Sequence, residues 1–250
     1  MAMAIVFWRG RIYSQPSANR HKAIQDRSIC FHAAALLKDT AGMNSLLEDG
    51  QDVDASGLVH GDPALCVAAA QMHSDGVHLL LRYGANVHAY SNSIDPRTRI
   101  GRLQDSQAIH YSAASAFKCT SAEDSAQVCL VLNMLVGAGA DVNARSRSTQ
   151  LAGYKATPLM LAARTGDVEV VDMLLRLGAD PHLEAKHDDC EDSCPCDIRY
   201  PQGDVSVSLT ALDFVQKKLD NCDVSMGGME PVRHARFSAV VALLEKVMGF

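Results

Sequence analysis

Three cysteines and one histidine occur between residues 187 and 197, in a segment rich in aspartate and glutamate. Thiolate and imidazole groups are common ligands of tetrahedral zinc, so we consider a zinc site formed by His187, Cys190, Cys194 and Cys196. The spacing argues against such a site, because structural zinc sites usually pair Cys-x-x-Cys, whereas only Pro195 separates Cys194 from Cys196. Nearby carboxylates also disfavour thiolates when no metal is present. Three alternatives stay open: bound zinc, a disulfide within the segment and, as we favour, free thiols on an acidic loop.

Basic side chains gather in two other segments. Segment 90–106 has three arginines against two aspartates, and segment 145–156 has three basic residues and no acid. Guanidinium groups bind carboxylates and phosphates through paired, charge-assisted hydrogen bonds. The residues that we predict to contact a partner are Arg97, Arg99, Arg102, Arg145, Arg147, Tyr154 and Lys155. The alternative is that these charges only solvate two loops.

Motifs of common enzyme classes are missing from the sequence. The glycine-rich stretch GAGAD, residues 137–141, could be half of a dinucleotide fingerprint, but it follows a predicted helix rather than a strand. The chain also has no serine-nucleophile elbow and no helix with paired zinc-binding histidines. The sequence therefore predicts neither an enzyme nor a cofactor, apart from the zinc alternative.

The composition of the chain limits the class of protein and the kinds of partner. The chain has 250 residues, of which 48% are hydrophobic and 21% charged, values typical of a globular protein with a sizeable core. Its formal charge of -6 gives no general attraction to nucleic acid or to an anionic membrane, so we expect neither as a partner. Eight cysteines without a recognisable secretory signal predict reduced thiols in the cytosol or nucleus.

The first 27 residues form a distinct segment. Its apolar run AMAIVFW, residues 2–8, is too short to cross a bilayer. We expect residues 1–27 to be an N-terminal extension that packs Ile5, Phe7 and Trp8 on the first structural unit. An organelle-targeting sequence is the alternative, because four basic residues precede the first acidic residue, Asp26.

One segment, residues 156–182, has a particularly regular helical pattern. Thr157 can cap a first helix, and Pro158 suits its first position because proline has no N–H to leave unpaired. A second helix is predicted by apolar residues at helical spacing, namely Val168, Val171, Leu174 and Leu175. Gly178 supplies the left-handed residue that ends this helix.

The same pattern recurs along the chain, and we predict one domain, residues 28–250, built from five such units. The units lie near residues 29–55, 63–89, 107–144, 157–183 and 210–249. The third and fifth fit only if extra residues enter between their two helices.

These units resemble the ankyrin repeat, which has Thr-Pro-Leu-His-x-Ala-Ala at its first helix and Gly-Ala-Asp-Val-Asn-Ala after its second. The matching stretches are TPLMLAA (157–163), GANVHA (84–89), GAGADVNA (137–144) and LGADPH (177–182). The resemblance implies a solenoid in which the connection after each second helix projects as a finger. Three fingers are extended, at 90–106, 145–156 and 184–209. The resemblance also implies protein binding by the concave face.

The histidine of the family motif is present in only two units, as His32 and His110. The resemblance implies that its ring links neighbouring loops rather than acting as a catalytic base. Cys66, Met160 and Asp213 replace it elsewhere, and we expect less regular hydrogen bonding between those units.

We therefore predict an all-α ankyrin-repeat solenoid of about five helix-turn-helix units with extended finger loops. Its expected function is that of a cytoplasmic or nuclear adaptor that binds an acidic or phosphorylated protein segment. One alternative is a small-molecule-binding protein or enzyme that uses the groove between fingers, near His110, Tyr111 and Tyr154. Another is a zinc-binding or redox-sensing loop at 187–196.

Overall fold

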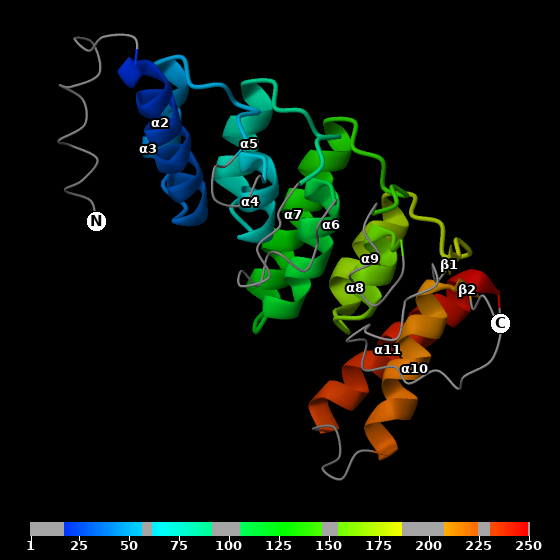
Figure 1. The fold of residues 1–250 in the computed structure, drawn as a ribbon. Coiled ribbons are helices and arrows are strands. Elements are labelled where there is room, and N and C mark those ends of the chain that lie inside the picture. Colours follow the sequence, from blue (N-terminus) through cyan, green and yellow to red (C-terminus); the bar gives the residue numbers. More distant parts are fainter. Residues whose placement is uncertain are drawn as a thin grey trace.

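The computed structural model of the chain describes residues 18–56, 62–91, 106–146, 155–186, 208–224 and 231–249. For residues 18–26, 220–224 and 231–233 it describes the backbone alone. Figure 1 shows these parts as a curved row of helix pairs running from the N-terminal to the C-terminal end.

The described residues form five consecutive helix pairs. They are α2 (Ala18–Leu36) with α3 (Thr40–Glu48), α4 (Ala64–Ala70) with α5 (Ser74–Arg82), α6 (Ala108–Ser115) with α7 (Ala122–Gly137), α8 (Pro158–Ala163) with α9 (Val168–Arg176), and α10 (Ala211–Val224) with α11 (Pro231–Met248). A short 3-10 helix, η2 (Ala116–Lys118), follows α6. Each first helix contacts the first helix of the next pair, and the second helices contact one another in the same way. This two-layer solenoid confirms the predicted helical fold.

The fourth helix pair has the capping residues that were predicted from the sequence. The Met160 N–H donates to Thr157 Oγ1 at 3.4 Å, and Pro158 takes the first position of α8. At the other end, Gly178 follows α9 with φ of 93°, and Gly139 follows α7 with φ of 97°. Both values lie in the left-handed region that glycine adopts without strain. GAGAD is therefore a helix end and not a phosphate-binding loop.

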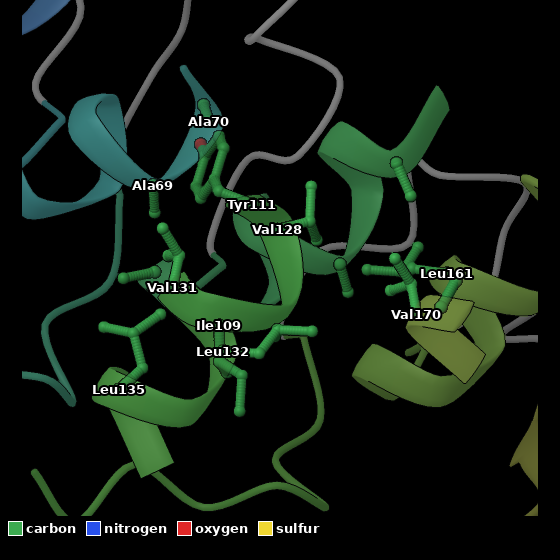
Figure 2. Close-up of a cluster of buried hydrophobic side chains, with 14 of the residues drawn as sticks. Ala69, Ala70, Ile109, Tyr111, Val128, Val131, Leu132, Leu135, Leu161 and Val170 are labelled. Atoms are coloured by element: carbon green, nitrogen blue, oxygen red, sulfur yellow. The ribbon is translucent and has the colours of Figure 1, made fainter. Parts of the chain in front are cut away.

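The first helices of the inner pairs are enclosed on all sides. Every residue of α4 and of α8 is buried, and most of them are alanine or other small residues that allow neighbouring backbones to approach closely. The second helices supply larger aliphatic side chains. Figure 2 shows Ile109 of α6 packed among Val131, Leu132 and Leu135 of α7. The core is therefore a continuous seam between the two layers.

Insertions in two units lengthen helices instead of forming loops. In the third unit the extra residues were expected between the two helices, but many of them belong to α7, which begins at Ala122. Ser121 and Asp124 explain this start: the Asp124 N–H donates to Ser121 Oγ at 3.2 Å, and the Ser121 N–H donates to Asp124 Oδ2 at 3.1 Å. This reciprocal capping box lets the inserted residues continue the helix. In the fifth unit, α10 extends to Val224 and α11 begins at Pro231.

His110 joins two parts of the third unit. Its Nδ1 accepts the Gln107 N–H at 3.3 Å, so the neutral ring carries its proton on Nε2, which donates to the Ala144 carbonyl at 2.9 Å. Met160 reproduces only the first of these bonds, because its sulfur accepts the Thr157 N–H at 3.4 Å and has no proton to donate. Replacement of the histidine therefore keeps the helix cap and loses the link to the following loop.

The first helix is longer than the sequence pattern predicted. It begins at Ala18, within the segment expected to precede the repeats, and continues to Leu36. His32 lies on this helix, with Nε2 2.9 Å from the carbonyl oxygen of Asp62 at the start of the second unit. In the part of the chain that the structure describes, no helix is long and apolar enough to cross a bilayer.

Candidate partner-binding surface

Each connection that follows a second helix, from the first pair to the fourth, is closed at its base by backbone pairing. We call these closures necks. The paired residues are Ser56 with Pro63, Ser91 with Ser106, Ser146 with Ala156, and strand β1 (Ala185–Lys186) with strand β2 (Ser208–Leu209). In the second and third necks an N–H donates to a carbonyl, at 2.9 Å from Ser91 to Ser106 and at 3.1 Å from Ser146 to Ala156. The necks therefore fix where each finger starts and returns.

The turns beneath the fingers are tied to one another. Asp54 Oδ1 accepts the N–H of Asn86 in the next unit at 2.9 Å. Asn143 repeats the arrangement farther along the chain, because its Oδ1 accepts the Asp180 N–H at 2.9 Å. These bonds join the first unit to the second and the third unit to the fourth, at the turns that precede the necks.

Two of the predicted partner-binding residues, Arg145 and Lys155, belong to the described part of the chain. Both are exposed, and they flank the neck formed by Ser146 and Ala156. The other five lie outside the described residues: Arg97, Arg99, Arg102, Arg147 and Tyr154. The described geometry therefore places two cations at the base of the 145–156 finger.

Arg145 also reaches the next finger. Its Nη1 donates to the backbone carbonyl of Glu184 at 2.5 Å. Glu184 directly precedes β1, so this bond fixes the guanidinium between the bases of the second and third extended fingers. A guanidinium has five N–H donors, and the bond to Glu184 uses one of them. An exposed guanidinium held in this way can still bind a carboxylate or phosphate.

Beneath the 90–106 finger lies a buried polar cluster. The Tyr111 hydroxyl donates to Ser91 Oγ at 2.7 Å, and the Ser106 N–H approaches the same oxygen at 3.5 Å. Figure 2 shows the Tyr111 ring rising from α6 towards the end of α4, beside Ala69 and Ala70. Burial raises the pKa of the Tyr111 hydroxyl, and the carboxylate of Asp62 raises it further. The cluster supports the neck and keeps its tyrosine neutral.

Neither His110 nor Tyr111 is placed to act on a ligand in the groove. Their exposed fractions are 0% and 1%, so both side chains are closed to solvent. Burial lowers the pKa of His110 to about 4, although backbone hydrogen bonds partly oppose this effect. Burial likewise raises the pKa of the nearby Cys66 thiol, with a second contribution from Asp62. These groups stay neutral at pH 7, and their burial removes them as the groove residues of the enzyme alternative.

The predicted zinc ligands His187, Cys190, Cys194 and Cys196 lie outside the described residues. Within the described ranges, no three histidine, cysteine or acidic side chains are grouped so that they could hold a metal ion. The cysteines whose side chains the structure describes are not in disulfides, namely Cys30, Cys66, Cys119 and Cys129.

Sequence reasoning missed the necks and the cluster beneath the first extended finger. Only a weak indication of the necks was present in the sequence: serines occur near both ends of the 90–106 segment, as Ser91 and Ser106, and again at Ser146. Serine is common in turns and does not by itself indicate which residue it will face. The contact of Tyr111 with Ser91 joins residues twenty positions apart and depends on the stacking of two units.

Two segments of the chain, residues 60–92 and 154–186, match the family model described as Ankyrin repeat. They contain the second and fourth helix pairs, together with the turns in which the finger necks begin. No curated protein sequence matches the chain.

Proposed function

We propose that this helical solenoid, two segments of which match the ankyrin-repeat model, is a protein-binding module that presents its fingers to an extended segment of a partner. Ankyrin repeats are in general protein-interaction modules, and stacked repeats provide long binding surfaces. In the proposal, the 90–106 and 145–156 fingers bind a partner segment that carries carboxylates or phosphates. The module acts as an adaptor without catalysis, in the cytosol or nucleus, where its thiols remain reduced.

The observation that carries this proposal is the position of Arg145 and Lys155. Both are exposed at the neck of the 145–156 finger, and Arg145 is oriented by its bond to the Glu184 carbonyl. A cation held by the scaffold loses little conformational freedom when a ligand binds, which favours affinity. The two cations therefore form a prepared anchor for an anionic group.

A four-residue variant tests the proposal. Arg97, Arg99, Arg145 and Arg147 are replaced by serine, and proteins captured from cell extract are compared by mass spectrometry with those captured by the unaltered chain. Partners lost on substitution are then titrated as purified proteins at several salt concentrations. We expect weaker binding and a flatter salt dependence, because fewer ionic contacts form. Phosphatase treatment of the partner distinguishes phosphates from carboxylates.

A matched control removes the same number of positive charges from helices, outside the finger segments. Four exposed residues serve for this control: Arg82, Arg176, Arg236 and Lys246. It separates contacts at the fingers from a general effect of net charge. Equal capture and equal affinity for the unaltered chain and the finger variant, measured at low salt, would exclude the basic fingers as the binding surface.

A further inference from the structure

The first helix carries an exposed apolar stripe that the inner first helices lack. Ile29, Ala33 and Leu36 lie on one face of α2 at helical spacing. Ile29 is 43% exposed and Leu36 47%, and Leu37 directly after the helix is 63% exposed. By contrast, every residue of α4 and α8 is buried. We call Ile29, Ala33 and Leu36 the α2 stripe.

The stripe lies on the side of α2 away from its described neighbours. The helix packs on α3 and α4, and its buried residues, among them Phe31, Ala34 and Ala35, are on the opposite face. In a stack of repeats, the end unit has an interface that no further unit fills, and a capping element usually covers it. The apolar side chains of the stripe require such a cover, because large exposed apolar patches are uncommon on soluble proteins.

The geometry points to residues 2–8 of the same chain, and we propose that this segment docks on the α2 stripe and caps the solenoid. The segment AMAIVFW has no charged residue and includes Trp8, the one tryptophan of the chain. Its Ile5, Phe7 and Trp8 match the apolar character of the stripe. The sequence predicted that this segment packs on the first unit, and the stripe specifies the receiving surface.

The intervening chain is long enough for this docking. Nine residues, 9–17, separate Trp8 from the start of α2. Fully extended, they span about 30 Å at roughly 3.3 Å per residue. From Ala18 to Ile29 the helix rises about 16 Å, and to Leu36 about 27 Å, at 1.5 Å per residue. The tether also gives the segment a high effective concentration at the stripe, which favours it over a second copy of the protein.

Trp8 fluorescence in the full chain tests the proposal. We expect emission at shorter wavelength than in the unfolded chain and poor quenching by acrylamide, because the indole is covered. The double variant Ile29→Asp with Leu36→Asp should shift the emission to longer wavelength and raise the quenching constant several-fold. Helix content from circular dichroism should not change, since both side chains are exposed. Ala33→Arg is a second variant at the same surface and should have the same effect.

Val247→Asp on α11 is the matched control, because Val247 is 48% exposed at the other end of the solenoid. It should leave the Trp8 spectrum unchanged. The proposal is overturned if acrylamide freely quenches Trp8 in the unaltered chain. It is also overturned if Trp8 is shielded in the unaltered chain and stays equally shielded in both stripe variants. Shielding that appears only with dimer formation, measured by light scattering over a range of concentrations, identifies a second copy as the occupant and also overturns it.

Discussion

His110 shows how burial selects one protonation state for a single side chain. The neutral ring donates from Nε2 to the Ala144 carbonyl and accepts the Gln107 N–H on Nδ1, so a second proton would break the latter bond. Burial lowers its pKa from 6.5 to about 4. Below pH 6.5 the unfolded chain therefore binds a proton that the folded chain excludes, and stability falls as the pH falls from 6.5 through about 4.

This linkage predicts a pH-dependent stability that one substitution removes. For the unaltered chain, His110 should lower the free energy of unfolding by about 2 kcal/mol between pH 7 and pH 5. His110→Gln should lose less stability over this interval, because glutamine can still donate to Ala144 but does not titrate. Urea unfolding at both pH values measures the difference. Burial also lowers the pKa of His73, so only the difference between the two proteins reports on His110. Equal pH dependence would contradict the prediction.

Gly166 is a second residue whose identity the packing requires. It adopts φ of 76°, and a Cβ added there would lie 3.0 Å from the ring of Phe237 on α11. Gly166→Ala should lower the free energy of unfolding by about 1–2 kcal/mol from backbone strain, with an added cost from the contact with the ring. Gly178→Ala is the control, since Gly178 has φ of 93° with no atom within 4 Å of such a Cβ. Thermal or urea unfolding should show the larger loss for Gly166→Ala, and equal losses would refute the packing argument.

Among elements, α9 shows how far helical periodicity locates the core. The pattern predicted that Leu174 and Leu175 each sit in the seam between helix pairs. Leu174 is indeed fully buried, but Leu175 is only partly so. Adjacent residues are about 100° apart around a helix, so both cannot point to the centre of the same interface.

The two leucines therefore differ in their expected contribution to stability. Leu174→Ala should reduce the free energy of unfolding by about 2–5 kcal/mol, as for other fully buried leucines. Leu175→Ala should cost clearly less, because solvent already reaches its side chain and a smaller cavity forms. Denaturant unfolding of both variants tests this order. A larger loss for Leu175→Ala would mean that the buried face of α9 is wrongly assigned.

The helix pairs were predictable because each unit combines apolar residues at helical spacing with a residue that ends the helix, such as Gly178 after α9. The early start of α7 was also encoded locally, by Ser121 with Asp124 three residues later, but these residues do not belong to the repeat pattern. For the surface, sequence indicated the charge of the fingers and not their geometry. The bond from Arg145 to the Glu184 carbonyl arises only when two units stack.

For the whole molecule, the distribution of the cysteines predicts a pattern of thiol reactivity. Cys66 is 1% exposed, and burial and Asp62 both raise the pKa of its thiol, so it should react slowly with an alkylating reagent. Cys190, Cys194 and Cys196, which we propose to be free thiols on an acidic finger, should react fast in the native protein. A chelator should not change their rates. Site-resolved mass spectrometry after short labelling times measures each cysteine.

The alternatives for this finger give different patterns. Bound zinc would keep the three thiols and His187 unreactive until a chelator removes the metal, because coordination occupies the sulfur lone pairs. A disulfide would make reactivity depend on prior reduction. Slow labelling at all three positions that a chelator accelerates would therefore replace the free-thiol proposal with a metal site.

Because the necks are closed, the packing of the helices does not depend on which residues make up a finger. Each finger starts and ends at paired residues, such as Ser146 and Ala156, so the scaffold has the same endpoints whatever chain lies between them. Doubling the length of a flexible loop costs only about 0.6 kcal/mol. Evolution could thus diversify recognition by exchanging whole loops, and a protein engineer could graft a foreign peptide between Ser146 and Ala156 with little effect on the helical stack.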